Sequence, residues 1–140
     1  MIILDTNILS ALMRAKPDAE VISWLDRQPA QSVWITTITL FEARFGIALL
    51  APSRRRRDIE RAFSQVLNED LEGRVLELDQ IGAEKAATLA ADRRRTGRTI
   101  DFRDTLIAGI VLARKATLAT RNRKHFEDLS VPVVNPWDVG

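Results

Sequence analysis

Three acidic side chains fall where the sequence predicts that strands end or that helices begin. Asp5 directly follows the apolar run of residues 2–4. Glu42 lies in the first turns of one predicted helix, Asp104 lies near the start of another, and Asn122 follows a later strand. In parallel sheets ligands bind beyond the carboxyl ends of the strands. We therefore expect these four side chains to converge at one edge of the sheet.

Carboxylates that converge repel one another, by about 1 kcal/mol at 4 Å in water and by about 4 kcal/mol at an effective dielectric near 20. A divalent cation would remove that repulsion. The chain has no cysteine and a single histidine, His125, so its donors are oxygens and favour Mg²⁺ or Mn²⁺. Such an ion can orient and polarise a phosphodiester. Each acid taken alone could equally be a helix cap or a surface charge.

Basic residues are unevenly distributed along the chain. The net charge is only +2, but residues 91–125 hold ten basic and three acidic side chains, and four arginines run together at positions 54–57. A local excess of arginine favours a polyanionic partner such as a nucleic acid. A solvated surface would have the same composition, so this pattern depends on the acidic motifs for its meaning.

Strands and helices alternate along the chain, which predicts an α/β fold with a mostly parallel sheet of four to five strands. We expect strands at residues 2–4, 33–35, 75–78, 117–120 and 131–134. Helices are expected after residues 5–7, after residue 18, after a cap at Thr37 or Thr39, and over residues 58–67, 81–95 and 102–114.

Length and composition indicate one domain over residues 1–140. The chain has 46% hydrophobic and 29% charged residues, as globular proteins do. The absence of cysteine excludes a disulfide framework and a thiolate nucleophile. The longest apolar run is far short of the ~20 residues that cross a membrane. The N-terminus lacks the pattern of a signal peptide, so we expect a cytoplasmic protein.

Five short motifs together give the whole chain a recognisable pattern. They are residues 3–7 (ILDTN), 38–42 (ITLFE) with Gly46 a turn later, 104–108 (DTLIA), 118–122 (LATRN) and 135–137 (NPW). In this order, the motifs resemble those of PIN-domain ribonuclease toxins of the VapC/FitB type. The resemblance implies a three-layer α/β/α fold and a metal-dependent endoribonuclease that acts as the toxin of a type II toxin–antitoxin pair.

The resemblance also implies roles for individual residues. Asp5, Glu42 and Asp104 would ligate Mg²⁺ or Mn²⁺, directly or through water, and the family's fourth acidic position falls on Asn122. An amide there can still accept a hydrogen bond, but it adds no charge, so we expect weaker binding of any second metal ion.

Further residues are assigned auxiliary roles in this interpretation. The hydroxyls of Thr6 and Thr120 match positions beside the metal. Asp101 would assist there or cap the helix that follows it. Arg121 and Arg123 are the candidates for contact with RNA. His125 is interpreted as structural, and the tryptophans Trp24, Trp34 and Trp137 as core or tail-docking residues.

The same resemblance implies partners. We expect a cognate VapB/FitA-like antitoxin that blocks the acidic pocket, contact with DNA only through that antitoxin, and a homodimer. The docking groove for the antitoxin is expected around Ile8, Leu12, Trp24 and the helix that carries Glu42.

Two other functions remain open from the sequence. A PIN fold that has lost its activity could serve only to bind an antitoxin-like partner, which the neutral Asn122 would permit. A phosphotransferase could instead use Asp5 as its nucleophile. That chemistry usually needs a second acid two residues on, where this chain has Asn7.

Overall fold

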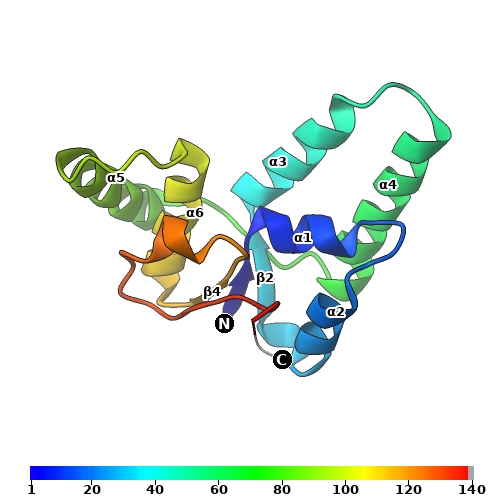
Figure 1. Cartoon of the computed structure of the whole chain (residues 1–140), viewed down its shortest axis with the longest axis horizontal. Helices are drawn as coiled ribbons and strands as arrows, with labels where there is room; N and C mark the ends of the chain where they lie inside the picture. The colour runs from blue at the N-terminus through cyan, green and yellow to red at the C-terminus, as the bar shows by residue number, and fades with distance from the viewer. Residues whose placement is uncertain (139–140) are drawn as a thin grey trace.

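One parallel sheet of five strands forms the centre of the protein (Figure 1). The computed structural model describes residues 1–138, so the last two residues of the predicted domain lie outside the described part. The strand order is β3-β2-β1-β4-β5, and every neighbouring pair is parallel. The strands are β1 (Ile2–Leu4), β2 (Val33–Thr36), β3 (Val75–Leu76), β4 (Thr117–Ala119) and β5 (Val133–Val134). The α/β class predicted from the sequence is confirmed.

Six α-helices, counted over residues 1–138, connect the strands. They are α1 (Thr6–Leu12), α2 (Ala19–Asp26), α3 (Thr37–Ala48), α4 (Arg54–Gln65), α5 (Gln80–Arg95) and α6 (Phe102–Arg114). Shorter helical segments follow at Ala30–Ser32, at Val66–Asp70 after α4, and at Arg123–Phe126 after β4.

Alternate residues of the central strands face opposite sides of the sheet. Ile3 and Leu118 pack into the core beneath α5 and α6, whereas Leu4 and Ala119 pack into the core beneath α1 to α4. Figure 1 shows α5 and α6 on the left of the sheet and α1, α2 and α4 on its right. Because the strands are buried on both faces, the predicted α/β/α arrangement of three layers is confirmed.

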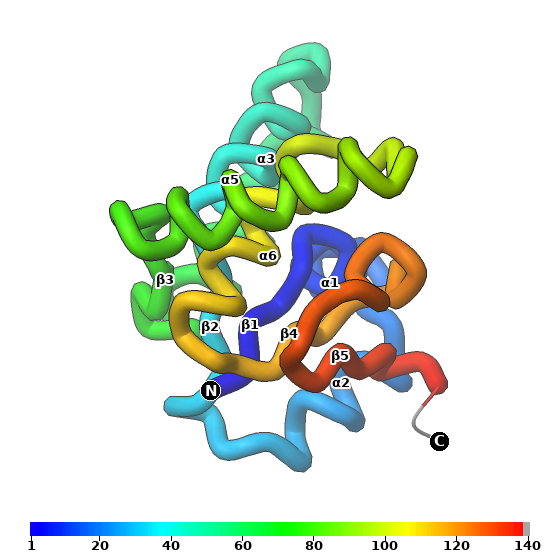
Figure 2. Tube along the Cα trace, turned by 90° about the vertical axis from the view of Figure 1, so that its left-hand side faces the viewer, coloured from blue at the N-terminus to red at the C-terminus, as the bar shows by residue number. Residues whose placement is uncertain are grey.

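Helix α5 crosses α6 at close range (Figure 2). A Cβ atom built on Gly109 would lie 2.6 Å from the Cβ of Ala86 and would also clash with the carbonyl oxygen of Gly82. The contact therefore requires glycine in α6, and it fixes the position of the helix that carries Asp104.

Several element boundaries differ from the sequence prediction, and capping side chains explain most of the differences. Helix α4 begins at Arg54 rather than at residue 58, because the Ser53 side chain accepts a hydrogen bond from the Arg56 N–H at 3.1 Å. Helix α3 is capped by Thr36 and not by Thr37 or Thr39, the two caps that the sequence predicted. Strand β3 ends at Leu76 before Asp79 caps α5. The last strand starts at Val133, two residues late.

Over residues 1–138, none of the helices combines the length and the apolar character that crossing a membrane requires.

Candidate active site

Asp5 is buried at the end of β1, where the start of α1 and the turn after β4 hold its carboxylate. Its Oδ1 accepts a hydrogen bond from the Thr6 N–H at 2.8 Å, and its Oδ2 accepts one from the Thr120 hydroxyl at 2.8 Å. The pKa of Asp5 is raised from 3.8 to about 6: burial is the main cause, the charges of Asp104 and Glu42 add to it, and the hydrogen bonds from Thr120 and Thr6 oppose it. Asp5 therefore lies within electrostatic reach of both other acids.

Glu42 reaches the same place from α3. The Thr6 hydroxyl donates to Glu42 Oε1 at 2.8 Å, and it lies 3.1 Å from the Thr39 hydroxyl. Thr36 caps α3 and thereby sets the rotation of the helix about its axis. Thr6 thus connects the start of α1 to the acid on α3, and Figure 1 shows the starts of both helices directly above β1 and β2.

Asp104 comes from the first turn of α6 and is paired with a histidine. Its Oδ2 lies 3.0 Å from Nδ1 of His125, in the helical segment after β4. Phe126, next to His125, is fully buried and anchors that segment. The structural interpretation of His125 from the sequence was incomplete, because the ring contacts one of the three candidate metal ligands.

Arg103 lies among these acids. Its Nη1 is 3.7 Å from Glu42 Oε2, and its Nε and Nη2 are 3.2 and 3.1 Å from the two carboxylate oxygens of Asp101. Hydrogen bonding to Asp101, followed by the charges of Asp101, Glu42 and Asp104, raises the pKa of Arg103. Asp101 itself caps α6, since its carboxylate accepts from the Arg103 N–H at 2.8 Å.

The turn after β4 completes the site. The Thr120 hydroxyl, which donates to Asp5, also accepts from the Asn122 N–H at 3.0 Å. Asn7 donates to Asp5 Oδ2 at 3.3 Å and accepts from the Arg121 N–H at 3.2 Å. The backbone of Asn122 is held beside Asp5, while its side chain is exposed.

The two arginines predicted to contact RNA differ in their surroundings. The Arg121 guanidinium lies 4.6 Å from the centre of the Trp137 ring, and Trp137 donates through Nε1 to Asp18 at 2.8 Å. Trp137 therefore docks the tail against α2, as expected. Arg123 is exposed in the segment after β4.

A buried arginine supports the Asp104–His125 pair from behind. Arg93 of α5 is 3% exposed and donates to both carboxylate oxygens of Asp128 at 2.9 Å. It also donates to the Thr105 hydroxyl at 2.8 Å and to the His125 carbonyl at 2.7 Å. Thr105 is the neighbour of Asp104 in α6, and His125 is the other member of the pair. Arg93 therefore contacts the chain on both sides of the pair.

The oxygen donors and the negative charges of the three acids fit a hard divalent cation, but the three side chains do not form one set of metal ligands in this structure. Within residues 1–138 no three acidic or histidine side chains form a ready-made metal site. Glu42 is turned toward Arg103, and Asp104 is turned toward His125. The buried carboxylate of Asp5, with two like charges close by, is the feature that a cation would relieve.

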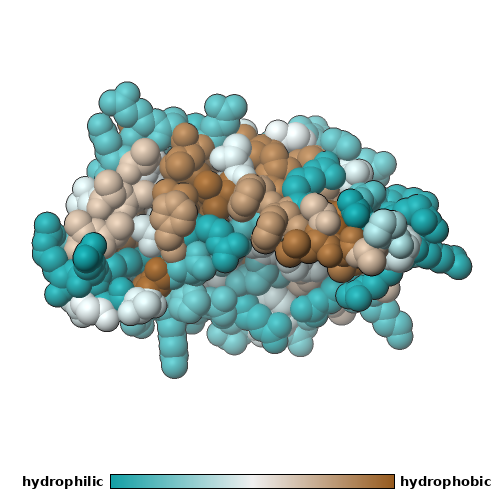
Figure 3. Space-filling model, turned by 90° about the horizontal axis from the view of Figure 1, so that it is seen from above, coloured by the Kyte–Doolittle hydropathy of each residue, from teal (hydrophilic) through white to brown (hydrophobic). Residues whose placement is uncertain are grey.

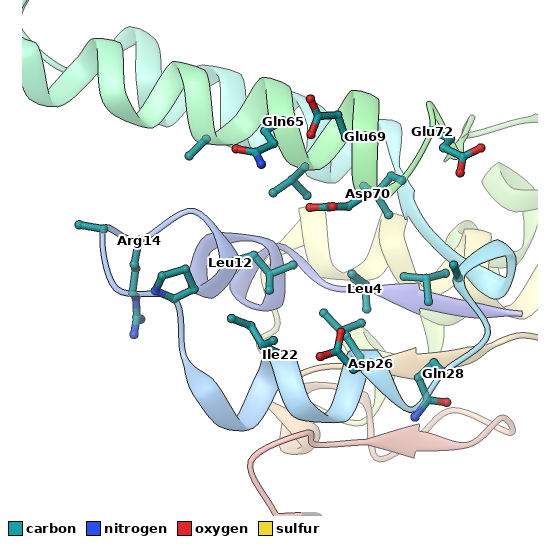
Figure 4. A pocket seen from close by; sticks show the side chains of 18 residues that line it. Leu4, Leu12, Arg14, Ile22, Asp26, Gln28, Gln65, Glu69, Asp70 and Glu72 are labelled. Atoms are coloured by element: carbon teal, nitrogen blue, oxygen red, sulfur yellow. The ribbon is translucent and has the colours of Figure 1, made fainter.

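Two adjoining grooves lie between the helices on one side of the sheet, and one of them reaches the site. The first, which we call the α2 groove, lies between α1, α2 and the end of α4 and includes Leu12 and Ile22 (Figure 4). The second, the α3 groove, lies between α1, α3 and α4 and reaches Thr6 and Glu42. The prediction that Ile8 and Trp24 line a groove was wrong, because both side chains are buried in the core.

Comparison with known proteins identifies the family. The family model described as "PIN domain" matches residues 2–131. The chain belongs to the PIN-domain family. This PIN domain is 34% identical over 138 residues to the VapC ribonuclease Y4jK of Sinorhizobium fredii, covering 99% of each chain. It is 32% identical over 137 residues to the toxin FitB of Neisseria gonorrhoeae, covering 98% of this chain and 99% of that one.

A solved structure agrees with these relatives. The structure of FitAB bound to an IR36 DNA fragment contains a chain that superposes on this PIN domain with a TM-score of 0.88 and 31% identity, over 100% of this chain and 98% of that chain. The VapC/FitB type and the PIN-like fold predicted from the motifs are therefore confirmed.

The site contains residues that the sequence interpretation did not single out. Asn7, Arg103 and Arg93 all contact candidate site residues or their immediate neighbours. Asn7 lies within the first motif, next to Asp5 and Thr6, so its position was a usable signal. Arg93 and Arg103 are spread among many other arginines, and only the fold distinguishes them.

Proposed function

We propose that this PIN domain is a metal-dependent endoribonuclease toxin that a cognate antitoxin inhibits. The observation that carries the proposal is the buried Asp5 carboxylate, which faces the charges of Glu42 and Asp104 among oxygen donors. The similarity to a VapC ribonuclease and to the toxin FitB supports it.

Asp5, Glu42 and Asp104 would hold Mg²⁺ or Mn²⁺, with the hydroxyls of Thr6 and Thr120 beside them. When bound, the ion would polarise the phosphodiester and make water a better nucleophile. Thr120 and Thr6 orient the carboxylates of Asp5 and Glu42. The exposed amide of Asn122 can accept a hydrogen bond from water at the mouth of the pocket, and Arg121 and Arg123 offer charge to the RNA backbone.

The test is cleavage of RNA by the purified protein with Mg²⁺ or Mn²⁺ added. We expect products only when a divalent ion is present, loss of cleavage with EDTA, and loss in an Asp104→Asn variant that stays folded. Thermal unfolding gives an independent reading, because an ion at a hundred times its Kd stabilises the native state by about 2.7 kcal/mol.

The alternative of an inactive interaction module predicts a different result in the same assay. A module without a metal site shows neither cleavage nor a rise in melting temperature with Mg²⁺ or Mn²⁺. That pair of observations would replace the nuclease proposal.

The partner that we propose is a VapB/FitA-like antitoxin with a segment in the α3 groove. The groove reaches Thr6 and Glu42, so its occupant would cover the acidic pocket. Contact with DNA would come only through the antitoxin; the similar FitAB structure is of a complex bound to a DNA fragment. A gene for a short DNA-binding protein beside the gene for this chain would support the pairing.

The proposed function implies where the protein acts and how its chain is organised into domains. RNA and a promoter-bound antitoxin both lie in the cytoplasm, where we place the protein. We treat residues 1–140 as a single PIN domain, since the family model spans residues 2–131.

We also propose that the toxin is a homodimer. Helix α3 exposes the stacked rings of Phe41 and Phe45, whose centres are 5.8 Å apart, and Leu49 lies further along it. Phe102 on α6 and Ile81 on α5 are exposed as well, and Figure 3 shows apolar side chains gathered on the face seen from above. A second copy of the chain would bury such a surface.

Mutation of the α3 face tests the dimer. We expect the wild-type protein to have the mass of two chains by light scattering, and a Phe41→Glu/Phe45→Glu variant to have the mass of one, because the charges cannot be buried. Ile22→Glu is the matched control, since Ile22 is an exposed apolar residue in the α2 groove. A wild-type monomer, or an unchanged mass in the double variant, would contradict the proposal.

A further inference from the structure

Arg103 is a cation placed among carboxylates that the proposed function assigns to a metal ion. Its side chain is 42% exposed and lies beside the Glu42 carboxylate. One edge of the guanidinium, Nε and Nη2, is held by the two oxygens of Asp101 at 3.2 and 3.1 Å. The remaining nitrogen, Nη1, is directed toward Glu42 at 3.7 Å.

The two contacts of Arg103 differ in strength. The pair with Asp101 is bidentate, and Asp101 is itself fixed as the cap of α6. The pair with Glu42 is long and partly exposed, a kind of ion pair that contributes little. If Glu42 turns to a metal ion, Arg103 keeps its hold on Asp101, and its Nη1 becomes free to donate at the mouth of the pocket.

In a nuclease, the anion that a free arginine N–H beside three carboxylates would bind is a phosphate of the substrate. A guanidinium presents a planar array of donors that matches the oxygens of a phosphate, and its charge is permanent. Charge that develops on the phosphoryl oxygens during cleavage is stabilised by donors already in place. Arg103 occupies such a position because Asp101 holds it there before substrate arrives.

Resting on the proposed nuclease function, we propose that Arg103 is a substrate-binding residue that donates to a non-bridging oxygen of the RNA phosphodiester at the cleavage site, with Asp101 as its positioning residue. This gives Asp101 a role in addition to the cap of α6, which was one of the two roles expected from the sequence, and in place of the other, an auxiliary metal contact.

A different role for Arg103 would be to hold Glu42 in place for the metal ion. The two roles predict different effects on metal binding. Removal of a positive charge that only faces the ligands leaves Mn²⁺ affinity unchanged or tighter. Removal of a group that orients Glu42 weakens the Mn²⁺ affinity. Mn²⁺ titration in the absence of RNA therefore separates the two roles without any measurement of activity.

The experiment compares Arg103→Gln with Arg114→Gln. Arg114 is exposed in the last turn of the same helix, so both variants lose one arginine charge from α6. Three quantities are measured on each protein: Mn²⁺ affinity by calorimetry, kcat/KM for cleavage of a single-stranded RNA, and the dependence of RNA affinity on salt.

For Arg103→Gln we expect kcat/KM to fall about 100-fold, as when one preorganised donor to a transition-state oxygen is removed. The slope of log affinity against log salt should fall by about 0.7, the value for one lost phosphate contact on a single strand. Mn²⁺ affinity should stay within threefold of the wild type or become tighter. Arg114→Gln should match the wild type in all three measurements.

The conservative and positioning variants sharpen the test. Arg103→Lys keeps the charge but loses the planar fork, so it should recover part of the lost rate. Asp101→Asn should lower kcat/KM by about tenfold without a change in Mn²⁺ affinity, because the guanidinium loses its orientation but not its charge.

Two results would overturn the assignment of Arg103. One is a kcat/KM for Arg103→Gln within twofold of the wild type. The other is a loss of rate that equals a loss of Mn²⁺ affinity, which would make Arg103 a support for Glu42. A wild-type protein that neither binds Mn²⁺ nor cleaves RNA would instead overturn the proposed function, and the assignment of Arg103 with it.

Discussion

Asp5→Asn should abolish RNA cleavage and, in the absence of metal, make the folded protein more stable at neutral pH. The fold raises the pKa of Asp5 from 3.8 to about 6, chiefly through burial, so the native state disfavours the ionised form. A rise in pKa of that size lowers the free energy of unfolding by about 3 kcal/mol at neutral pH. The amide removes the charge while it keeps an oxygen for the Thr6 N–H.

The pH dependence of this effect follows from the sign of the shift. A carboxyl group whose folded pKa is raised binds protons more tightly in the native state, so its ionisation destabilises the fold as pH rises from about 4 to about 6. Asp5→Asn should therefore add about 1–3 kcal/mol to the free energy of unfolding at pH 7.5 and close to nothing at pH 4. Urea denaturation in EDTA at both pH values measures it.

Asp18→Asn is the matched control for Asp5→Asn. Its hydrogen bond from Trp137 is the main cause that lowers the pKa of Asp18, so the same change there should not stabilise the protein at neutral pH. Equal cleavage by Asp5→Asn and the wild type would remove Asp5 from the site. A less stable Asp5→Asn variant at pH 7.5 would show that the carboxylate is not strained in the metal-free fold.

Asp128→Asn should destabilise the protein by about 3 kcal/mol, at the low end of the range for breaking a buried ion pair because water reaches one side of Asp128. The substitution leaves the Arg93 charge buried with no anion against it. Arg93 holds the pKa of Asp128 below its ordinary value, so this contribution is present above about pH 4 and is lost as the pH falls through the lowered pKa.

Asp92→Asn provides the comparison for Asp128→Asn. Asp92 pairs with Arg95 at the same 2.9 Å, but both side chains are more than half exposed, so its loss should change stability by about 0.5 kcal/mol or less. Urea denaturation of both variants measures the difference. If Asp128→Asn is no more destabilising than Asp92→Asn, the Arg93 network does not hold α5 to the segment after β4.

The sequence predicted helices and strands correctly where capping residues and apolar runs were clear. Helix α6 begins and ends at the predicted residues, because Asp101 caps its start and Lys115, in the left-handed conformation, ends it. The apolar runs identified the strands. The rule that sites lie at the carboxyl ends of parallel strands predicted that Asp5 and the turn that holds Asn122 lie together, and the hydrogen bond from Thr120 in that turn to Asp5 agrees with it.

Prediction failed where burial decides the role of a residue. Ile8 and Trp24 were assigned to a groove, but an apolar residue on a short helix gives no sign of whether it faces a core or a cleft. Arg93 and Arg103 were counted among ten basic residues that looked alike in sequence. One is buried in an ion-pair network and the other lies beside Glu42, and only long-range packing makes that distinction.

The position of β4 next to β1 has a consequence for the protein while it is being synthesised. Asp5 and Glu42 emerge from the ribosome early, but the strand that completes their surroundings spans Thr117–Ala119 and is followed by Thr120, which holds Asp5. An unfinished chain that ends before this strand has an open sheet edge and lacks the Thr120 hydroxyl that holds Asp5. On the proposed function, such a fragment would hold Asp5, Glu42 and Asp104 without the partner that orients Asp5, and RNA cleavage would begin only once about the last sixth of the polypeptide is made.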